Sequence, residues 1–334
     1  MDYLNISDLT GPEWRFLEPY CDDPALTWQV FSGRPMNALE RRVTRPALGR
    51  YRACLAAVWA ARGRKDSVLV SHLPNVSLAV AGFARRLAQR VPHVAFAFNY
   101  TQQPEGRRLA LARDYFRDIH EFTVFSRHEV DLYADLFDLP RERFAFLPWA
   151  MEAPEVAQDV PLPFDQPYFS AIGGEGRDYA VLATAMRQLP EARLAIVARP
   201  ASVAGIAFPD NVRVFTNLPA PLTWAIAKGS LGMAVPLLSD RTPNGHVTLV
   251  GAQHLGIPLV VTESLGVADY VDPSVATLVP AGQAEAMAVA LSALITGPEA
   301  AAERAARGLS RAQDQSDLRV WVAYFRTLDQ RLRG

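Results

Sequence analysis

An alternation of strand-like and helix-like segments constrains the fold of this chain more than any other feature. Short apolar runs rich in valine, leucine and phenylalanine alternate with helical segments of about 10–15 residues, and the alternation restarts after residue 167. Strands spaced in this way form βαβ units and a parallel sheet. Several of the runs are apolar throughout, which is typical of strands covered on both faces. The sequence therefore predicts an α/β protein with two doubly wound, Rossmann-like domains.

The expected elements follow from the apolar periodicity and from proline and glycine breaks. In the first half we expect strands at 3–7, 27–31, 67–71, 94–98, 121–125 and 144–147, with helices at 38–61 (broken near 46–49), 76–89, 109–117 and 127–137. In the second half we expect strands at 168–172, 193–197, 212–215, 231–235 and 275–279, with helices at 177–189, 221–228, 283–296, 299–311 and 318–332.

A proline-rich stretch marks the expected domain boundary. Five prolines fall between residues 148 and 167, where periodicity is poor. We therefore expect an N-terminal domain at 1–150, a linker at 151–167 and a C-terminal domain at 168–314. A last helix at 315–334 is expected to pack back on the N-terminal domain.

Composition excludes several classes of protein. The 334 residues carry a net charge of −1, which argues against bulk binding of nucleic acid. Two cysteines cannot form a disulfide framework or a metal cluster, and a reducing cytoplasm suits them best. No signal peptide is visible and no run of about 18 apolar residues occurs. We therefore expect a cytoplasmic protein.

Residues 244–262 predict an anion site. The segment contains a polar turn at Asn244 and Gly245, a short helix, a Gly-x-Pro break at 256–258 and a buried strand. A helix that starts on Asn-Gly presents backbone N–H groups and the positive end of its dipole, which suits phosphate.

The same segments resemble the GT-B glycosyltransferases, and in particular the bacterial family 4-like enzymes. Residues 173–179 are similar to a family run Gly-Gly-x-x-Arg-Asp-Tyr, and 244–271 resemble its donor-binding segment, with a valine-proline turn at 279–282. Residues 125–129 and 146–149 are looser matches. The resemblance implies two domains facing across a cleft, transfer from a nucleotide-diphosphate sugar, and no bound metal or other cofactor.

One departure from the family affects the mechanism. Many family 4 enzymes carry a Glu-x7-Glu pair whose second glutamate contacts the donor ribose. Here Gly251 stands at that position, and the first falls near Pro243 or Asn244. The motif therefore does not indicate whether the sugar is transferred with retention or inversion.

Candidate ligands for the donor lie after the expected strands of the second half. Arg177 is expected to open its helix, as a phosphate ligand or as a surface arginine paired with Asp178 or Glu175. Arg199 follows a strand, as a second phosphate ligand or as a rim salt bridge. The expected donor-binding residues are Gly174, Arg177, Arg199, Leu218, Asn244, Gly245, His246, Val247 and Thr248.

For three candidate residues the sequence leaves two interpretations open. Leu218 lies in a loop that holds the nucleotide base or is a plain proline-containing loop. His246 contacts diphosphate or sugar, or is an exposed histidine at a helix start. Asp240 binds sugar hydroxyls or caps its turn.

A catalytic base is expected where a strand of the first half ends. His72 follows such a strand, and its pKa would suit a general base, although a histidine hydrogen-bonded within the loop is equally favoured. Asp8 is the second candidate, with Asp22 and Asp23 weaker. Asn99 cannot serve as a base but could bind substrate.

Residues 38–65 form a basic amphipathic segment. It holds eight basic side chains and one acid, Glu40, interleaved with apolar residues. Such a segment can lie on an anionic membrane surface and would suit a lipid-linked acceptor, at the inner face of the membrane. An ordinary helix pair with a solvated basic face is the alternative.

Three functions compete at this point. The first is a nucleotide-sugar glycosyltransferase that acts on a glycan or lipid-linked acceptor in bacterial surface polysaccharide synthesis. The second is a GT-B sugar-nucleotide epimerase, and the third is a non-catalytic GT-B partner subunit. The Glu and His dyads of an epimerase are not evident. The missing motif glutamates, and the lack of a glycine-rich loop after 3–7, favour the partner subunit.

Overall fold

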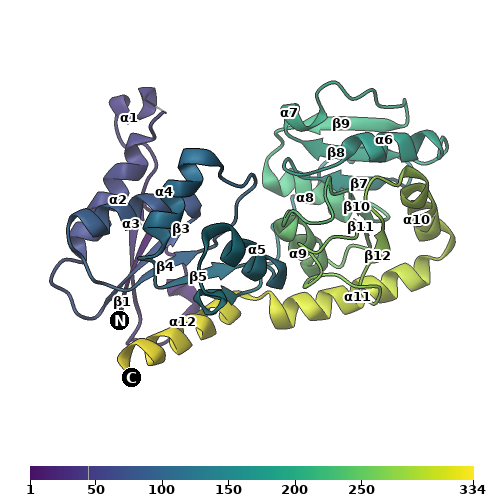
Figure 1. Ribbon diagram of the computed structural model, residues 1–334. Coiled ribbons are helices and arrows are strands. Elements are labelled where there is room, and N and C mark those ends of the chain that lie inside the picture. The colour runs from purple at the N-terminus through teal and green to yellow at the C-terminus, as the bar shows by residue number, and fades with distance from the viewer. Residues whose placement is uncertain (44) are drawn as a thin grey trace. The chain divides into compact units, whose positions relative to one another are not determined.

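The computed structural model describes residues 1–43 and 45–334 and contains two compact units. Unit 1 comprises Met1–Leu147 together with Leu318–Gly334, and unit 2 comprises Pro148–Asp317. Within the described residues, each unit contains a six-stranded parallel sheet flanked by helices (Figure 1). The α/β architecture and the two Rossmann-like units are confirmed. No described helix is long and apolar enough to cross a membrane.

The sheet of unit 1 has the strand order β2-β1-β3-β4-β5-β6. Its strands are β1 (Asp2–Ser7), β2 (Thr27–Ser32), β3 (Ser67–His72), β4 (His93–Phe96), β5 (Glu121–Val124) and β6 (Phe144–Phe146). Its helices are α1 (Ala38–Arg42), α2 (Leu48–Ala60), α3 (Pro74–Arg86), α4 (Gly106–Phe116), α5 (Arg127–Phe137) and α12 (Leu318–Arg333), with 3₁₀ turns η1 (Glu18–Tyr20) and η2 (Arg141–Arg143).

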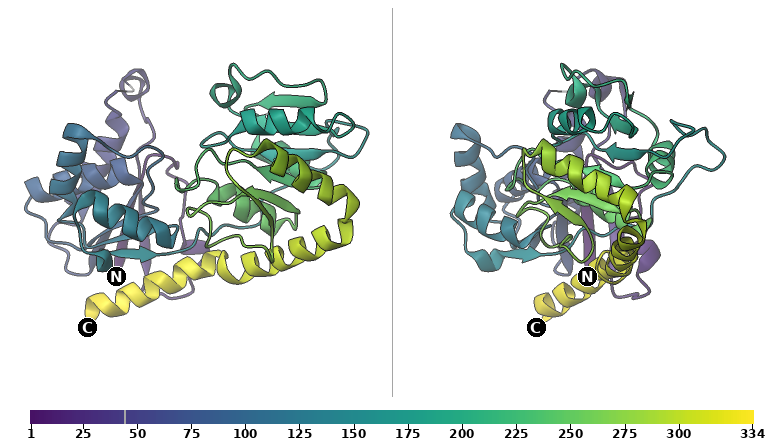
Figure 2. Two further views of the ribbon diagram at one scale, coloured as in Figure 1. Left: turned by 45° about the vertical axis from the view of Figure 1, so that its right-hand side comes forward. Right: turned by 90° about the vertical axis from the view of Figure 1, so that its right-hand side faces the viewer.

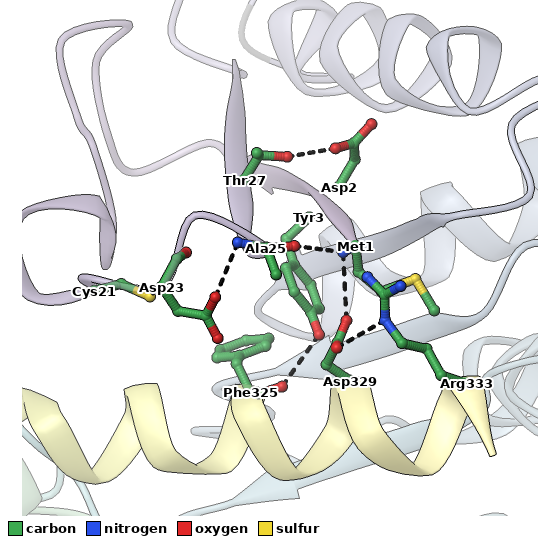
Figure 3. Close-up of polar contacts among 10 residues, drawn as sticks. All are labelled: Met1, Asp2, Tyr3, Cys21, Asp23, Ala25, Thr27, Phe325, Asp329 and Arg333. Atoms are coloured by element: carbon green, nitrogen blue, oxygen red, sulfur yellow. Dashed lines mark hydrogen bonds and ion pairs between the residues drawn. The ribbon is translucent and has the colours of Figure 1, made fainter.

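One face of this sheet packs on α2 to α5, and the other carries an aromatic cluster closed by α12. Phe325 of α12 packs within 5.5 Å, between ring centroids, of Tyr3, Trp28 and Phe96. The Tyr3 hydroxyl donates to the Phe325 carbonyl at 3.1 Å, and Asp329 pairs with both Arg333 and the Met1 amino group (Figure 3). The two ends of the chain therefore lie close together (Figure 2).

The sheet of unit 2 has the strand order β12-β11-β10-β7-β8-β9. Its strands are β7 (Phe169–Ile172), β8 (Leu194–Ala198), β9 (Val212–Thr216), β10 (Met233–Val235), β11 (Leu259–Thr262) and β12 (Thr277–Val279). Its helices are α6 (Tyr179–Arg187), α7 (Pro200–Val203), α8 (Ala220–Lys228), α9 (His246–His254), α10 (Ala284–Thr296) and α11 (Pro298–Gln315). Central strands β7, β8, β10 and β11 are buried throughout, as parallel strands covered on both faces must be.

Two expected boundaries differ for local reasons. The helix expected from residue 177 begins at Tyr179, because the Asp178 carboxylate accepts a hydrogen bond from Val181 N at 2.9 Å and so caps it. The strand expected at 94–98 ends at Phe96, because Ala97 has a positive φ of 54°.

The stretch expected as a linker, 151–167, contains no helix or strand and falls within unit 2. Its start is tied down, since Met151 N donates to the Ser316 carbonyl at 3.0 Å. The expected 38–61 helix is two helices, α1 and α2. A break is expected near 46–49, and α2 begins at Leu48; residue 44 lies outside the described residues.

Candidate functional site

Two loops of unit 2 meet at the point where its strand order reverses. β7 is flanked by β10 on one side and by β8 on the other, so the chain crosses from one half of the sheet to the other there. Leu238 N donates to the Gly176 carbonyl at 3.0 Å, and Asp178 N donates to the Pro236 carbonyl at 2.9 Å. The loop after β7 and the loop after β10 thus form one surface at the carboxyl ends of the strands. Open α/β sheets bind ligands at such a point.

Arg177 is buried at the centre of these loops. Its side chain donates to the carbonyls of Ile172 (3.4 Å) and Glu175 (2.9 Å) and to the Thr248 hydroxyl (3.0 Å). All three acceptors are neutral, and no carboxylate of the described residues forms an ion pair with it. Burial lowers the pKa of the guanidinium, which reflects the cost of an unmatched charge at 7 % exposure. An anion bound beside it would remove that cost.

This position corrects the expectation for Arg177. It does not open a helix, and it is not a surface arginine paired with Asp178 or Glu175. Asp178 caps α6, and the Glu175 carboxylate pairs with Arg199 instead.

The start of α9 lies beside Arg177. Gly245 is the N-cap residue with a φ of +105° and makes no side-chain cap, and Thr248 in the first turn accepts from Arg177. A Cβ placed on Gly245 would lie 3.7 Å from Nη1 of Arg177. The first N–H groups of an α-helix have no partner within the helix. The guanidinium and the helix start therefore offer two adjacent sources of positive potential.

Close backbone packing shapes the loop around this centre. Gly176 has a φ of +65°, and a Cβ there would lie 2.5 Å from Nδ2 of Asn244. Gly173 and Gly174 face the two arginines, since a Cβ on either would come within 2.8 Å of Arg177 or Arg199 respectively. Gly174, a predicted donor-binding residue, thus lies against Arg199, while Gly173 and Gly176 lie against Arg177 and Asn244.

Arg199 stands at the rim. It is 65 % exposed, forms an ion pair with Glu175, and immediately precedes α7. The rim salt bridge expected as its alternative is therefore present. It lies beside Gly174, so an anion at this surface would compete with Glu175 for the guanidinium.

His246 is buried rather than exposed. Its Nε2 hydrogen-bonds the Gly266 carbonyl at 2.7 Å, and its ring lies 4.9 Å from that of Tyr270. Burial lowers the pKa of His246 to about 4, so the ring is neutral at pH 7. It connects α9 to the loop after β11 and supplies no positive charge. This corrects the expectation of an exposed histidine at a helix start.

The other donor candidates are spread along the same edge. Val247 is exposed in the first turn of α9, and Asp240 is exposed in the loop after β10, where its carbonyl accepts from Leu265 N at 2.8 Å. Leu218 follows β9, the edge strand two positions from β7, and packs against the core beside Trp224. The structure therefore brings together the Arg177 group but places Leu218 away from it.

Gly251 cannot be replaced by an acid without moving a large side chain. A Cβ there would lie 2.4 Å from Cη2 of Trp224 and 3.1 Å from Cγ of Pro154. The position where the resemblance would place a ribose-binding glutamate is thus filled by an indole.

In unit 1 the structure does not favour His72 as a base. The side chain is 7 % exposed and lies about 5 Å, between ring centroids, from Trp14, Phe16 and Phe96. Its Nε2 is 3.2 Å from Oδ1 of Asn5, and burial lowers the pKa of His72 to about 3. A neutral ring enclosed by aromatic side chains has no open side for a reacting hydroxyl.

The other candidates of unit 1 already have partners. Asp8 forms an ion pair with Arg50 at 2.5 Å, and Asp22 forms one with Arg326. Asn99 donates from Nδ2 to Glu129 at 2.8 Å. The sequence did not indicate Glu129 as a site residue, although the Ser-x-x-Glu spacing from Ser126 indicates a capping box.

Several solved structures have an architecture similar to that of this chain. A glycosyltransferase from Rickettsia africae ESF-5 superposes with a TM-score of 0.71 at 9 % identity, covering 100 % of this chain and 98 % of that one. Sucrose-phosphate synthase from Thermosynechococcus elongatus gives 0.71 at 16 % identity, covering 99 % and 98 %. HepE from Anabaena in complex with UDP gives 0.70 at 15 % identity, covering 98 % and 99 %.

The chain has the GT-B fold. No family model matches it, and no curated protein matches it at the level of sequence. The GT-B likeness therefore rests on the fold and not on sequence similarity. Among the described residues, no group of three or more His, Cys, Asp or Glu side chains could hold a metal ion.

Proposed function

We propose that the chain is a glycosyltransferase that takes its sugar from a nucleotide-diphosphate sugar. The observation that carries the proposal is Arg177, a buried guanidinium without a carboxylate, beside the start of α9. A leaving diphosphate is the anion that a sugar-transfer reaction must stabilise, and a fixed guanidinium with helix N–H groups can do so without a metal. The UDP bound in the HepE structure supports this donor class.

The roles within the site follow from position. Arg177 and the first-turn amides of α9, at His246, Val247 and Thr248, hold the diphosphate. Arg199 gives up its ion pair with Glu175 and binds the diphosphate together with Arg177. Asn244 and Gly245 shape the approach, and Asp240 at the exposed rim contacts sugar hydroxyls.

The acceptor is proposed to be a glycan or a lipid-linked sugar of a bacterial surface polysaccharide, bound at the carboxyl edge of unit 1 around Asn99. We place the protein in the cytoplasm at the inner face of an anionic membrane. Support comes from α2, where Tyr51, Leu55 and Trp59 recur every four residues and are 41 %, 43 % and 59 % exposed. A helix with such a stripe beside basic residues suits a charged lipid surface.

Binding of nucleoside diphosphates tests the donor site. Calorimetric titration of the full chain with UDP, dTDP, GDP and ADP should show binding of at least one. Replacing Arg177 by Gln should weaken that binding about 10- to 100-fold, because a charge-assisted hydrogen bond contributes ~1.5–3 kcal/mol. Arg187→Gln, at the other end of α6, is the matched control and should bind like wild type.

The result also separates a second candidate function. Gly251 under Trp224 leaves no carboxylate for a ribose at that position, as a non-catalytic partner subunit would tolerate. If no nucleoside diphosphate binds the wild-type chain, the glycosyltransferase proposal fails and the partner subunit takes its place.

A further inference from the structure

Unit 1 has a hollow at the amino ends of its strands β4, β5 and β6. The hollow has a volume of about 620 Å³ and is lined by residues 89–93 and 118–120 and by Arg143, which lead into these three strands. Because the strands are parallel, the hollow lies at the opposite edge of the sheet from Asn99. Small-molecule sites commonly measure about 300–1,000 Å³, so the hollow is large enough for more than a single ion.

Main-chain hydrogen bonds hold the walls of this hollow in place. His120 N donates to the His93 carbonyl at 2.8 Å, and Leu69 N of β3 donates to the Pro92 carbonyl at 2.9 Å. Ile119, which precedes His120, is fully buried. The segments that form the hollow are therefore ordered before any ligand arrives, so binding does not have to order them.

Arg143 brings a half-buried guanidinium to the hollow. Its Nη1 donates to the Arg117 carbonyl at 3.0 Å and its Nη2 to the Phe116 carbonyl at 3.5 Å, at the end of α4. A guanidinium has five N–H groups, so the others remain for a further acceptor. Burial lowers the pKa of Arg143 more than the charge of Asp118 raises it. The carboxylate therefore does not offset the cost of burying this cation, whereas a bound anion would.

The other charges around the hollow leave it positive. Asp118 is the acid among the lining residues, and its carboxylate accepts from Nε of Arg85 at 2.6 Å. Arg90 is exposed, and neither it nor Arg143 forms an ion pair within the described part of the chain. His93 is neutral, because burial lowers its pKa to about 3. The two arginines therefore determine the sign of the ligand, which must be negative.

We propose that this hollow binds phosphate, either free or as the phosphoryl group of a small soluble molecule. Arg90 and Arg143 donate to the phosphoryl oxygens, and the rest of a larger ligand lies against Val91, Pro92 and Ile119. Arginine suits phosphate because its planar fork of donors matches two oxygens at once. A phosphoryl group carries about two negative charges at neutral pH, which matches two arginines. The site lies in unit 1 and does not depend on the proposed donor site of unit 2.

Backbone ¹H–¹⁵N signals of the full chain test the site, with inorganic phosphate and ribose 5-phosphate as probes. At least one probe should shift the signals of Val91, His93 and Ile119, and ribose without phosphate should not. Binding of either probe at Arg177 would appear separately, at residues 245–248. An affinity for inorganic phosphate that equals or exceeds that for ribose 5-phosphate identifies free phosphate as the ligand, whereas tighter binding of ribose 5-phosphate identifies a phosphorylated molecule. The proposal is overturned if neither probe shifts the signals around the hollow.

Substitutions assign the binding to the two arginines. Arg143→Gln should weaken it about 10-fold, because a hydrogen bond between charged groups is lost from a half-buried position. Arg90→Gln should weaken it about 2- to 5-fold, because Arg90 is exposed. Asp118→Asn removes a negative charge from the lining and should strengthen it about 2-fold.

Arg141→Gln is the matched control. Arg141 is exposed, lies on the same 3₁₀ turn as Arg143, pairs with Asp131 and is not part of the lining, so this variant should bind like wild type. Wild-type affinity in both Arg90→Gln and Arg143→Gln overturns the proposal. Should Arg143→Gln not fold, wild-type affinity in Arg90→Gln overturns it alone.

Discussion

At the scale of single residues, the buried histidines carry no charge, whereas the buried Arg177 does. His72, His93 and His246 are each buried, and burial lowers the pKa of these rings to about 3, 3 and 4. They are neutral in the folded state at any pH near neutrality. Arg177 cannot lose its charge, so this buried cation calls for an anion.

Acid should lower the stability of the fold, because these histidines are buried in their neutral form. A lowered folded-state pKa means that only the unfolded chain takes up the proton below pH 6.5, so stability falls as the pH falls, by ~1.4 kcal/mol per pH unit and histidine. Replacing His72 by Gln removes one such group. The difference in free energy of unfolding between wild type and His72→Gln, from urea titrations, should shift by ~1.4 kcal/mol in favour of the variant between pH 7.5 and 5.5.

At the scale of elements, the sequence identified nearly every strand and helix because the parallel strands are continuous apolar runs and the breaks are prolines and glycines. The failures are local. Asp178 is the N-cap of α6, so Arg177 lies before the helix. Ala97 ends its strand with a positive φ, which an alanine in the sequence does not indicate. The four-residue α7 has no periodicity to detect.

Part of the candidate site could be predicted, because several of its residues follow strands that end at one edge of the sheet. The sequence does not show which charged side chains form ion pairs with each other. Glu175 could pair with Arg177 or Arg199, and only the fold gives it to Arg199. The burial of His72 and His246 likewise depends on aromatic rings from distant segments.

The exposed stripe of α2 yields a prediction at the same scale. Arg50 and Arg52 of the basic segment are engaged by Asp8 and Glu40, so attraction to lipid must come from the remaining basic residues. The chain should co-sediment with vesicles containing phosphatidylglycerol at low salt and not with phosphatidylcholine alone. The double variant Leu55→Ser, Trp59→Ser should lose most of this binding, and Val289→Ser, at an exposed position of α10, should retain it. Absence of wild-type binding at low salt rules out the membrane surface.

At the scale of the whole molecule, the two units have separate hydrophobic cores. A nucleoside diphosphate that binds only the native second unit raises the stability of that unit by mass action. Hydrogen exchange of the full chain with a saturating ligand should slow at the loop after β7 and the start of α9. The amides of β3 and β4 serve as the reference and should exchange as before. Slowing confined to unit 1 would place the ligand elsewhere.

The return of α12 to unit 1 has a consequence for biosynthesis. Strands β1 to β4 leave the ribosome before Phe325, which covers their aromatic face. Unit 2 is continuous in sequence and is complete earlier than unit 1. The usual order, in which the N-terminal domain folds first, is therefore reversed for final closure. Until translation reaches α12, Tyr3, Trp28 and Phe96 form an uncovered aromatic face that a chaperone can bind.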